Sequence, residues 1–281
     1  MFARGLITKY GKRLLVLATI ALLFAPTSVQ ADSLNLKYQG HNDGPGLSYT
    51  LHGTSQGTVN GSTNPGTFNW NVRNDLTSNI GGNQGINQVN TPSLSTALGS
   101  NNTPVTSFCI ELREYIYDTT NVVNYTLVKD LSGLPKASLP NPMGPTAAHQ
   151  LQVLADLLDN AGFISAGYTN GQLQAAIWEI VYGANLDPYS GANGAAYNTA
   201  VSGILSAITL ADITYNANSA SQFFVGLDNI GIQDQITLVS PGTYNSIPPV
   251  PAPAGVVLAG MAFACVGGYN LLRRRKAIAA V

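Results

Sequence analysis

The chain has 281 residues, 45% of them hydrophobic, which is enough for one large domain or two small ones. Four of its 13 basic residues lie in the first 13 positions and four in the last nine, whereas all 14 acidic residues lie between these ends. The part between the ends therefore carries a net charge of −9. Such an acidic surface argues against nucleic acid and against anionic lipid as partners.

The first 31 residues have the order of an export signal. A basic segment precedes an apolar run at 14–24, and the small-residue cleavage site Val29-Gln30-Ala31 follows. We therefore expect a signal peptide over 1–31 and a mature domain that begins near Asp32. The apolar run is short for a membrane span, and an uncleaved anchor is the alternative.

The next part of the chain is rich in Gly, Asn, Ser and Thr, and short alternating runs interrupt it. This pattern predicts short strands joined by turns and long loops. The expected strands are 34–38, 47–51, 67–72, 105–112 and 122–128. In the strand at 105–112, Phe108 and Ile110 point to one face and Cys109 to the other. A second layer must therefore cover Cys109 if it is buried.

The composition then changes to helical periodicity. We expect a first helix from Pro145 or Thr146 that stops near Gly162. Asn170 is the expected cap of a second helix, which ends near Gly183. The remaining expected elements are a third helix at 194–208 and strands at 222–226 and 235–239.

This order of strands, helices and strands predicts an α+β fold. We interpret it as a β-sandwich or barrel with an inserted helical subdomain of about three helices. The subdomain covers about 145–208 within a domain of 32–245, and 246–281 form a tail.

Cys109 is the only cysteine of the expected mature domain, because Cys265 lies in the tail. Exported proteins usually contain cysteines in pairs that form disulfides. A single cysteine is either a small buried hydrophobe or a reactive group. Composition alone favours the buried hydrophobe.

Gln174 lies on the second helix and shares one face with Ile177, Trp178 and Val181. A primary amide on such a face is costly unless a partner satisfies it. A backbone group is the simple partner. The second possibility is Cys109, because a thiol and a glutamine amide that meet can condense to a thioester with loss of ammonia.

Two motifs occur together in this chain. Phe108-Cys109-Ile110 lies on a strand, and Leu173-Gln174-Ala175-Ala176-Ile177-Trp178 lies on a later helix. Over about 69–239 the chain resembles the thioester domains of bacterial surface adhesins. The resemblance implies a Cys109–Gln174 cross-link where a β-fold meets a helical subdomain. It also implies covalent capture of an amine-bearing surface protein or matrix component, without enzymatic turnover. The apolar pocket walls would be Phe108, Ile110, Ile177 and Trp178.

The tail resembles the PEP-CTERM sorting signal of Gram-negative bacteria. Val250-Pro251-Ala252-Pro253 precedes an apolar run of bilayer length at 254–272, and Arg273, Arg274 and Arg275 follow. Ala252 stands where the usual motif has Glu. The resemblance implies a transient inner-membrane span, an exosortase-type processing enzyme and a final place at the cell surface, in the outer membrane or outside the cell. Attachment to a biofilm or extracellular matrix follows from the same analogy, and a plain single-span anchor is the alternative.

The sequence gives little support for an enzyme active site, a metal site or a cofactor site. His41, His52 and His149 have no recognisable ligand spacing. A Cys109–His149 protease pair lacks any family signature. Glu111 and Glu179 are expected to be solvated carboxylates rather than catalytic groups, and His149 to be exposed. The alternative function is a non-covalent matrix or carbohydrate-binding module, with Trp70, Trp178 and scattered tyrosines as contacts.

Overall fold

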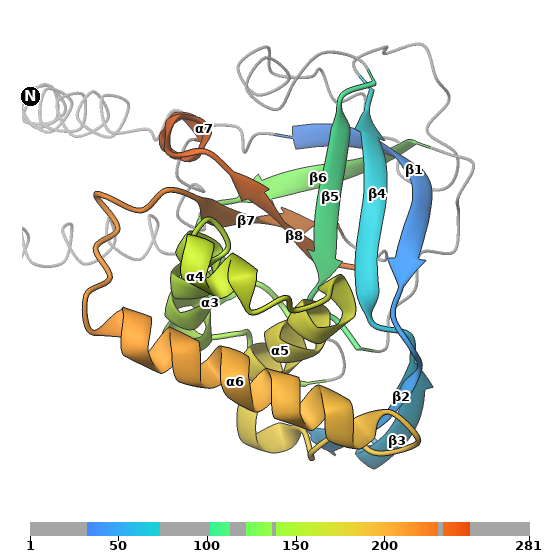
Figure 1. The fold of residues 1–281 in the computed structure, drawn as a ribbon. Helices are drawn as coiled ribbons and strands as arrows, with labels where there is room; N and C mark the ends of the chain where they lie inside the picture. The colour runs from blue at the N-terminus through green and yellow to red at the C-terminus, as the bar shows by residue number, and fades with distance from the viewer. Residues whose placement is uncertain (1–32, 74–101, 113–121, 137–138, 230–232, 248–281) are drawn as a thin grey trace, which may run out of the picture. The chain divides into compact units, whose positions relative to one another are not determined.

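The computed structural model describes residues 33–73, 102–112, 122–136, 139–229 and 233–247 (Figure 1). All of them fall within one compact unit, Ala31–Val250. The signal peptide and the sorting tail, including Val250 to Pro253 and Arg273 to Arg275, lie outside the described residues and stay predictions. In the part of the chain that is described, no helix has the length and apolarity needed to cross a membrane.

Six antiparallel strands close into a barrel. Alternate side chains of the strands fill the barrel interior, where most are apolar, and Trp70 and Tyr125 are fully buried and meet edge to face. In order around the barrel the strands are β1 (Ser33–Asp43), β4 (Gly66–Val72), β5 (Pro104–Cys109), β8 (Gln235–Val239), β7 (Phe223–Asp228) and β6 (Val122–Val128).

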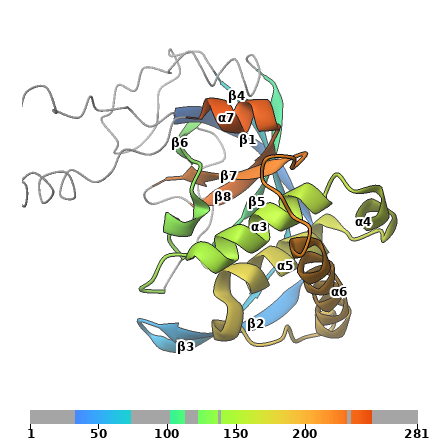
Figure 2. The ribbon, with the colours of Figure 1, turned by 90° about the vertical axis from the view of Figure 1, so that its left-hand side faces the viewer.

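A block of helices is inserted between β6 and β7. Figures 1 and 2 show these helices gathered together beside the strands, with α5 nearest to β5 in the middle of the layer. A second hydrophobic cluster joins the helices to the outer face of the barrel, where Phe108 meets Phe224 edge to face. The elements of the block are η1 (Leu131–Gly133), α3 (Pro145–Leu157), α4 (Ala161–Ser165), α5 (Asn170–Tyr182), η2 (Gly183–Asn185) and α6 (Gly194–Asp212).

A separate hairpin, β2 (Leu47–Thr54) and β3 (Gly57–Thr63), lies beside the helices. Backbone bridges from Ser48 to Ser190 and from Leu51 to Leu186 hold it there. The sequence did not predict β3, because its Gly, Thr, Asn and Ser residues alternate between exposed and half-buried positions without an apolar face. The last described helix, α7 (Pro241–Ser246), follows β8.

The predicted fold class is confirmed: the chain is α+β, with a six-stranded antiparallel barrel and about three helices packed together. Two predicted helix ends are wrong. Thr169, not Asn170, caps α5, in a capping box in which Thr169 and Gln172 bond each other's backbone N–H. Gly162 does not end the first helix, because Asn160 starts the additional short helix α4 by accepting from the Gly162 backbone N–H.

The strand predicted at 105–112 is shorter than expected and ends at Cys109. Beyond that point the Ile110 backbone N–H still donates to the Asp234 carbonyl at 3.1 Å, whereas side chains supply the hydrogen-bond partners of Leu112. The Leu112 backbone N–H donates to the Tyr182 hydroxyl at 3.1 Å, and the Tyr49 hydroxyl donates to the Leu112 carbonyl at 3.3 Å. This segment therefore leaves the barrel and passes beneath the helices.

Candidate functional site

Cys109 is the last residue of β5 and is buried, with 1% of its surface exposed. On one side its strand pairs with β8, where Cys109 lies opposite Gln235. On the other side the pairing with β4 stops at Phe108. The end of β5 therefore has a neighbouring strand on one side only.

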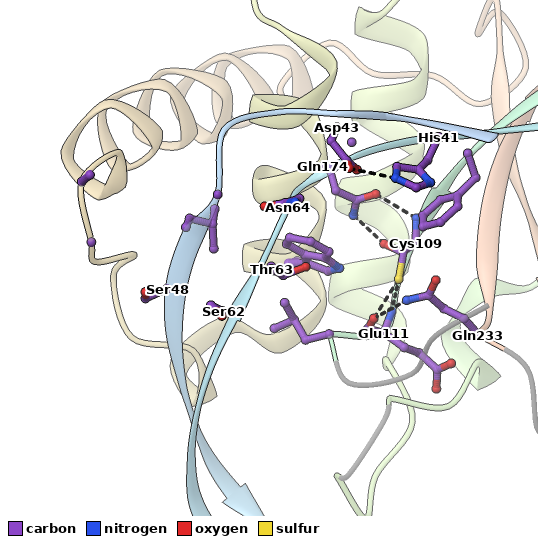
Figure 3. A pocket seen from close by; sticks show the side chains of 18 of the residues that line it. His41, Asp43, Ser48, Ser62, Thr63, Asn64, Cys109, Glu111, Gln174 and Gln233 are labelled. Carbon is purple, nitrogen blue, oxygen red and sulfur yellow. Dashed lines mark hydrogen bonds and ion pairs between the residues drawn. The ribbon is translucent and has the colours of Figure 1, made fainter. Parts of the chain in front are cut away.

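Gln174 takes the place of the missing strand. Its side chain is fully buried on α5, its Oε1 accepts from the Cys109 backbone N–H at 2.8 Å, and its Nε2 donates to the Cys109 carbonyl at 2.6 Å (Figure 3). These are the two hydrogen bonds that a strand would form. The structure thus brings the two predicted residues together, but it joins them through the backbone of Cys109.

The sulfur of Cys109 lies on the other side of the residue. Sγ donates to the Glu111 carbonyl at 2.7 Å and accepts from the Glu111 backbone N–H at 3.1 Å. Figure 3 shows the sulfur directed toward Glu111 and the Gln174 amide directed toward the Cys109 backbone. The sulfur must turn about the Cα–Cβ bond before it can attack the amide carbon.

Burial raises the pKa of the Cys109 thiol well above its usual value. The backbone N–H of Glu111 and the indole of Trp178 oppose this shift, while the negative charges of Glu111 and Asp234 add to it. The indole N–H of Trp178 is buried and has no hydrogen bond of normal geometry to any described residue. The sulfur at rest is therefore a neutral thiol, and the indole is one of the few groups that favour its ionised form.

The four predicted pocket walls, Phe108, Ile110, Ile177 and Trp178, are all buried in the same cluster as Cys109. Only Trp178 lines the pocket that reaches Cys109 and Gln174. Phe108 meets Phe224 edge to face, and the role of all four residues as walls around a thioester stays a prediction.

The pocket has a volume of about 750 Å³ and connects Cys109 and Gln174 to the surface. Sequence reasoning missed most of its lining, which comes from β1, from the hairpin and from the segment after η2. No motif marks these residues, because separate segments contribute one to four residues each. The missed lining includes Tyr38, His41, Asp43, Ser48, Ser62 and Asn64.

Glu111 is not the solvated carboxylate that the sequence predicted, since only 3% of its surface is exposed. Its side chain accepts from the Asp234 backbone N–H at 2.8 Å, and its carbonyl accepts from the Gln233 amide at 2.9 Å. Burial first, and then the charge of Glu111, raise the pKa of Asp234 to about 8, although a hydrogen bond from the Asn229 backbone N–H opposes the shift. A pair of acidic side chains thus lies beneath the thiol.

Two other expected candidates lie elsewhere. His149 is half exposed, as expected, and forms a 2.6 Å ion pair with Asp212 in a different pocket from that of Cys109, so no Cys109–His149 protease pair forms. Glu179 is half-buried on α5, where burial raises its pKa, and it is not among the residues that line the pocket. Among the described residues, no group of three or more His, Cys, Asp and Glu side chains could hold a metal ion.

The two tryptophans offered as surface contacts are both buried. Trp70 has no exposed surface and donates its indole N–H to the Ser107 hydroxyl at 2.8 Å inside the barrel. Trp178 is 3% exposed beside Cys109. Neither ring presents a flat face to a partner on the surface.

Comparison with models of protein families, with curated proteins and with solved structures found no match for this chain.

Proposed function

We propose that this chain is an exported domain in which Cys109 and Gln174 form an internal thioester that captures amine-bearing partners. One observation carries the proposal: the buried Gln174 carboxamide contacts the single cysteine of the exported part, at the inner end of an open pocket. The resemblance of the two motifs to bacterial thioester domains supports the same pairing.

Formation of the bond needs contact, orientation and exclusion of bulk water. The Cys109 sulfur attacks the amide carbon of Gln174, the C–N bond breaks, and the thiol proton leaves with the nitrogen as ammonia. The two backbone hydrogen bonds hold the amide carbon beside Cys109 before the reaction. The indole N–H of Trp178 favours the thiolate that must form on the way.

Capture reverses the exchange with a different nitrogen. A primary amine attacks the same carbon, the C–S bond breaks, and the amine nitrogen loses one proton while the sulfur gains one. The product is an ordinary secondary amide, which is far less electrophilic than a thioester. Each molecule therefore captures one partner, and the product persists.

The proposed partner is a lysine-bearing surface protein or matrix component. The exported part has only five basic residues against 14 acidic ones, so few of its own amines compete and positively charged partners are attracted. The resemblance of the tail adds two points to the proposal. An exosortase-type enzyme processes the chain, and its final location is the cell surface, the outer membrane or the outside of a Gram-negative cell.

The alternative is a non-covalent matrix or carbohydrate-binding module. The observation in its favour is that the oxygen and the nitrogen of the Gln174 amide both already form hydrogen bonds to the Cys109 backbone. The glutamine therefore has a structural role without any covalent bond. Its aromatic contacts would have to be residues other than Trp70 and Trp178.

Intact mass separates these functions. Protein freshly purified after expression of the full chain should be lighter than the sequence mass of its processed form by one molecule of ammonia, and should resist thiol reagents while folded. Methylamine should add at Gln174 and expose the Cys109 thiol. Cys109→Ala should abolish both effects and retain the fold, with a stability loss of about 1–2 kcal/mol. Full sequence mass together with a free thiol in fresh folded protein would refute the thioester.

A further inference from the structure

We propose that Tyr38, His41 and Asp43 form a proton relay that removes the proton from an amine as it opens the thioester. This inference rests on the function proposed above and adds to it the class of partner: basic primary amines, such as the lysine side chain. The relay comes from β1, a strand on which the sequence motifs place no functional residue.

A β-bulge brings the three side chains to one face. Along β1 the pairing with β4 shifts between Tyr38, which lies opposite Trp70, and Gly40, which lies opposite Asn69. In a regular strand Tyr38 and His41 would point to opposite faces, since they are three residues apart. The extra residue of the bulge places both side chains on the same face, and Gly40 adopts a positive φ of 133° at the bulge. Tyr38, His41 and Asp43 consequently all line the pocket that reaches Gln174.

Hydrogen bonds connect the three groups in one direction. Nε2 of His41 lies 2.8 Å from Oδ2 of Asp43, and Nδ1 of His41 is bonded to the Tyr38 hydroxyl. A carboxylate only accepts, so Nε2 carries the ring proton, and Nδ1 of the neutral ring accepts from the phenol. Burial and the charge of Asp43 raise the pKa of Tyr38, which keeps the phenol protonated as a donor. The phenol oxygen retains lone pairs that can accept a proton from an amine.

The relay lines the same pocket as Gln174. The side chains of His41 and Asp43 are 50% and 38% exposed, and Figure 3 shows both beside Gln174 at the same end of the pocket. The rings of Trp70 and Phe68 hold the Tyr38 ring, with centroid distances of 5.4 Å and 6.4 Å. The position of the phenol is thus fixed by the barrel, while the imidazole and the carboxylate face solvent.

The proton balance is complete without any added reagent. The amine nitrogen bonds to the carbonyl carbon of Gln174 and becomes positively charged. Its proton passes to the Tyr38 oxygen while the phenol proton passes to Nδ1 of His41, and Asp43 stabilises the resulting imidazolium. The C–S bond breaks, and the Cys109 thiolate receives a proton that the imidazolium returns through water. An amide and a thiol are the products.

Two similar pairs elsewhere in the fold serve as controls. His52 contacts Asp187 at 2.9 Å and His149 contacts Asp212 at 2.6 Å, each at the surface. Neither pair lines the pocket of Cys109. Within the described part of the chain a histidine is therefore paired with an aspartate at three places, and of these the pair on β1 is hydrogen-bonded to a phenol that lines the same pocket as Gln174.

The test measures the capture rate in Tyr38→Phe and His41→Gln, with His52→Gln as the matched control, all in the full-length expressed protein. Intact mass is first used to check that each protein has lost ammonia. The second-order rate constants for methylamine and hydroxylamine are then compared. We expect the methylamine rate to fall about tenfold or more in the two relay variants. The hydroxylamine rate should fall less, because that weakly basic nitrogen gives up its proton readily. His52→Gln should match the natural chain.

The outcomes separate the relay from the thioester. If the natural chain retains its ammonia, both proposals fall. If all variants lose ammonia and Tyr38→Phe and His41→Gln capture methylamine at the natural rate, the relay is wrong and the thioester stands. Equal slowing of both amines would indicate a steric effect on the pocket and would also overturn the relay. Tyr38→Phe removes a single oxygen, so it keeps the test decisive if His41→Gln does not form the thioester.

Discussion

Two buried glutamines lie against the same strand, and their surroundings differ. Gln235 of β8 accepts hydrogen bonds from the indole of Trp70 at 3.1 Å and from the hydroxyl of Ser107, inside the barrel. Gln174 of α5 bonds the Cys109 backbone two residues further along β5. Gln235 lies beside a hydroxyl in the barrel core, and Gln174 lies beside the backbone of a cysteine at the end of a pocket.

This difference in surroundings indicates that burial alone does not make an amide reactive. Ser107 bonds a glutamine amide through its hydroxyl and Cys109 bonds one through its backbone, but a thiol ionises far more easily than a serine hydroxyl and is the better nucleophile. An amine can reach Gln174 through the pocket, whereas Gln235 is not among the residues that line it. Chemistry is therefore expected at one glutamine and structural support at the other.

The largest expected effect comes from removing each glutamine in turn. Gln174→Ala should abolish ammonia loss and amine capture, and it should lower stability by about 1–3 kcal/mol, because the buried Cys109 backbone loses both partners. Gln235→Ala should lower stability by a similar amount, because it removes the acceptor of Ser107 and Trp70. The Gln235 variant should still lose ammonia. Intact mass and denaturant unfolding measure both. Full sequence mass in Gln235→Ala would show that the two sites are not separate.

The pH dependence of stability should show how Asp234, one of the two buried acidic side chains near Cys109, affects the surroundings of Gln174. The folded pKa of Asp234 is about 8, above its ordinary value of 3.8, so the folded state binds more protons between these values. Its contribution is complete below pH 4 and is lost as the pH rises toward 8. Asp234→Asn should flatten the stability curve there, by up to about 1.4 kcal/mol per pH unit. Unfolding measured between pH 5 and 8 tests this, and an unchanged slope would contradict the raised pKa.

The smallest expected effect concerns the helix that carries Gln174. Thr169→Ala should lower stability by about 1 kcal/mol, because it removes the cap and the capping box of α5. Asn170→Ala should change stability by less than about 0.5 kcal/mol, since its side chain forms only a 3.5 Å contact with Thr67. Thermal unfolding compares the two. A larger loss in the Asn170 variant would reverse the assignment of the cap.

Much of the fold could be predicted because it depends on local patterns. The alternation at 122–128 and 235–239 matches β6 and β8, and Pro145 begins α3 as expected. β3 could not be predicted, because it has no apolar face and is held by its pairing with β2. The additional helix α4 depends on one capping side chain, that of Asn160, which the apolar pattern does not contain.

The candidate site could be predicted in its two central residues and in Trp178, which lines the pocket. Cys109 and Gln174 were found because an unpaired cysteine in a domain expected to be exported and an amide on an apolar helix face are unusual. The burial of Glu111 could not be seen, since the strand pattern gives no sign that β5 ends at Cys109 and that the chain turns inward. The pocket lining on β1 depends on a bulge, which shifts faces without any change of composition.

The place of β5 between β4 and β8 has a consequence for the order of folding. The two residues of the site are 65 positions apart, and the strand that flanks Cys109 on its other side begins only at Gln235. Contacts of such sequence separation form late, after the loops between them have closed. A nascent chain that has emerged only as far as α6 holds both Cys109 and Gln174 but lacks the strand that completes the barrel. The proposed thioester should therefore form only after synthesis of the domain is complete, once the surroundings that shield it from water are in place.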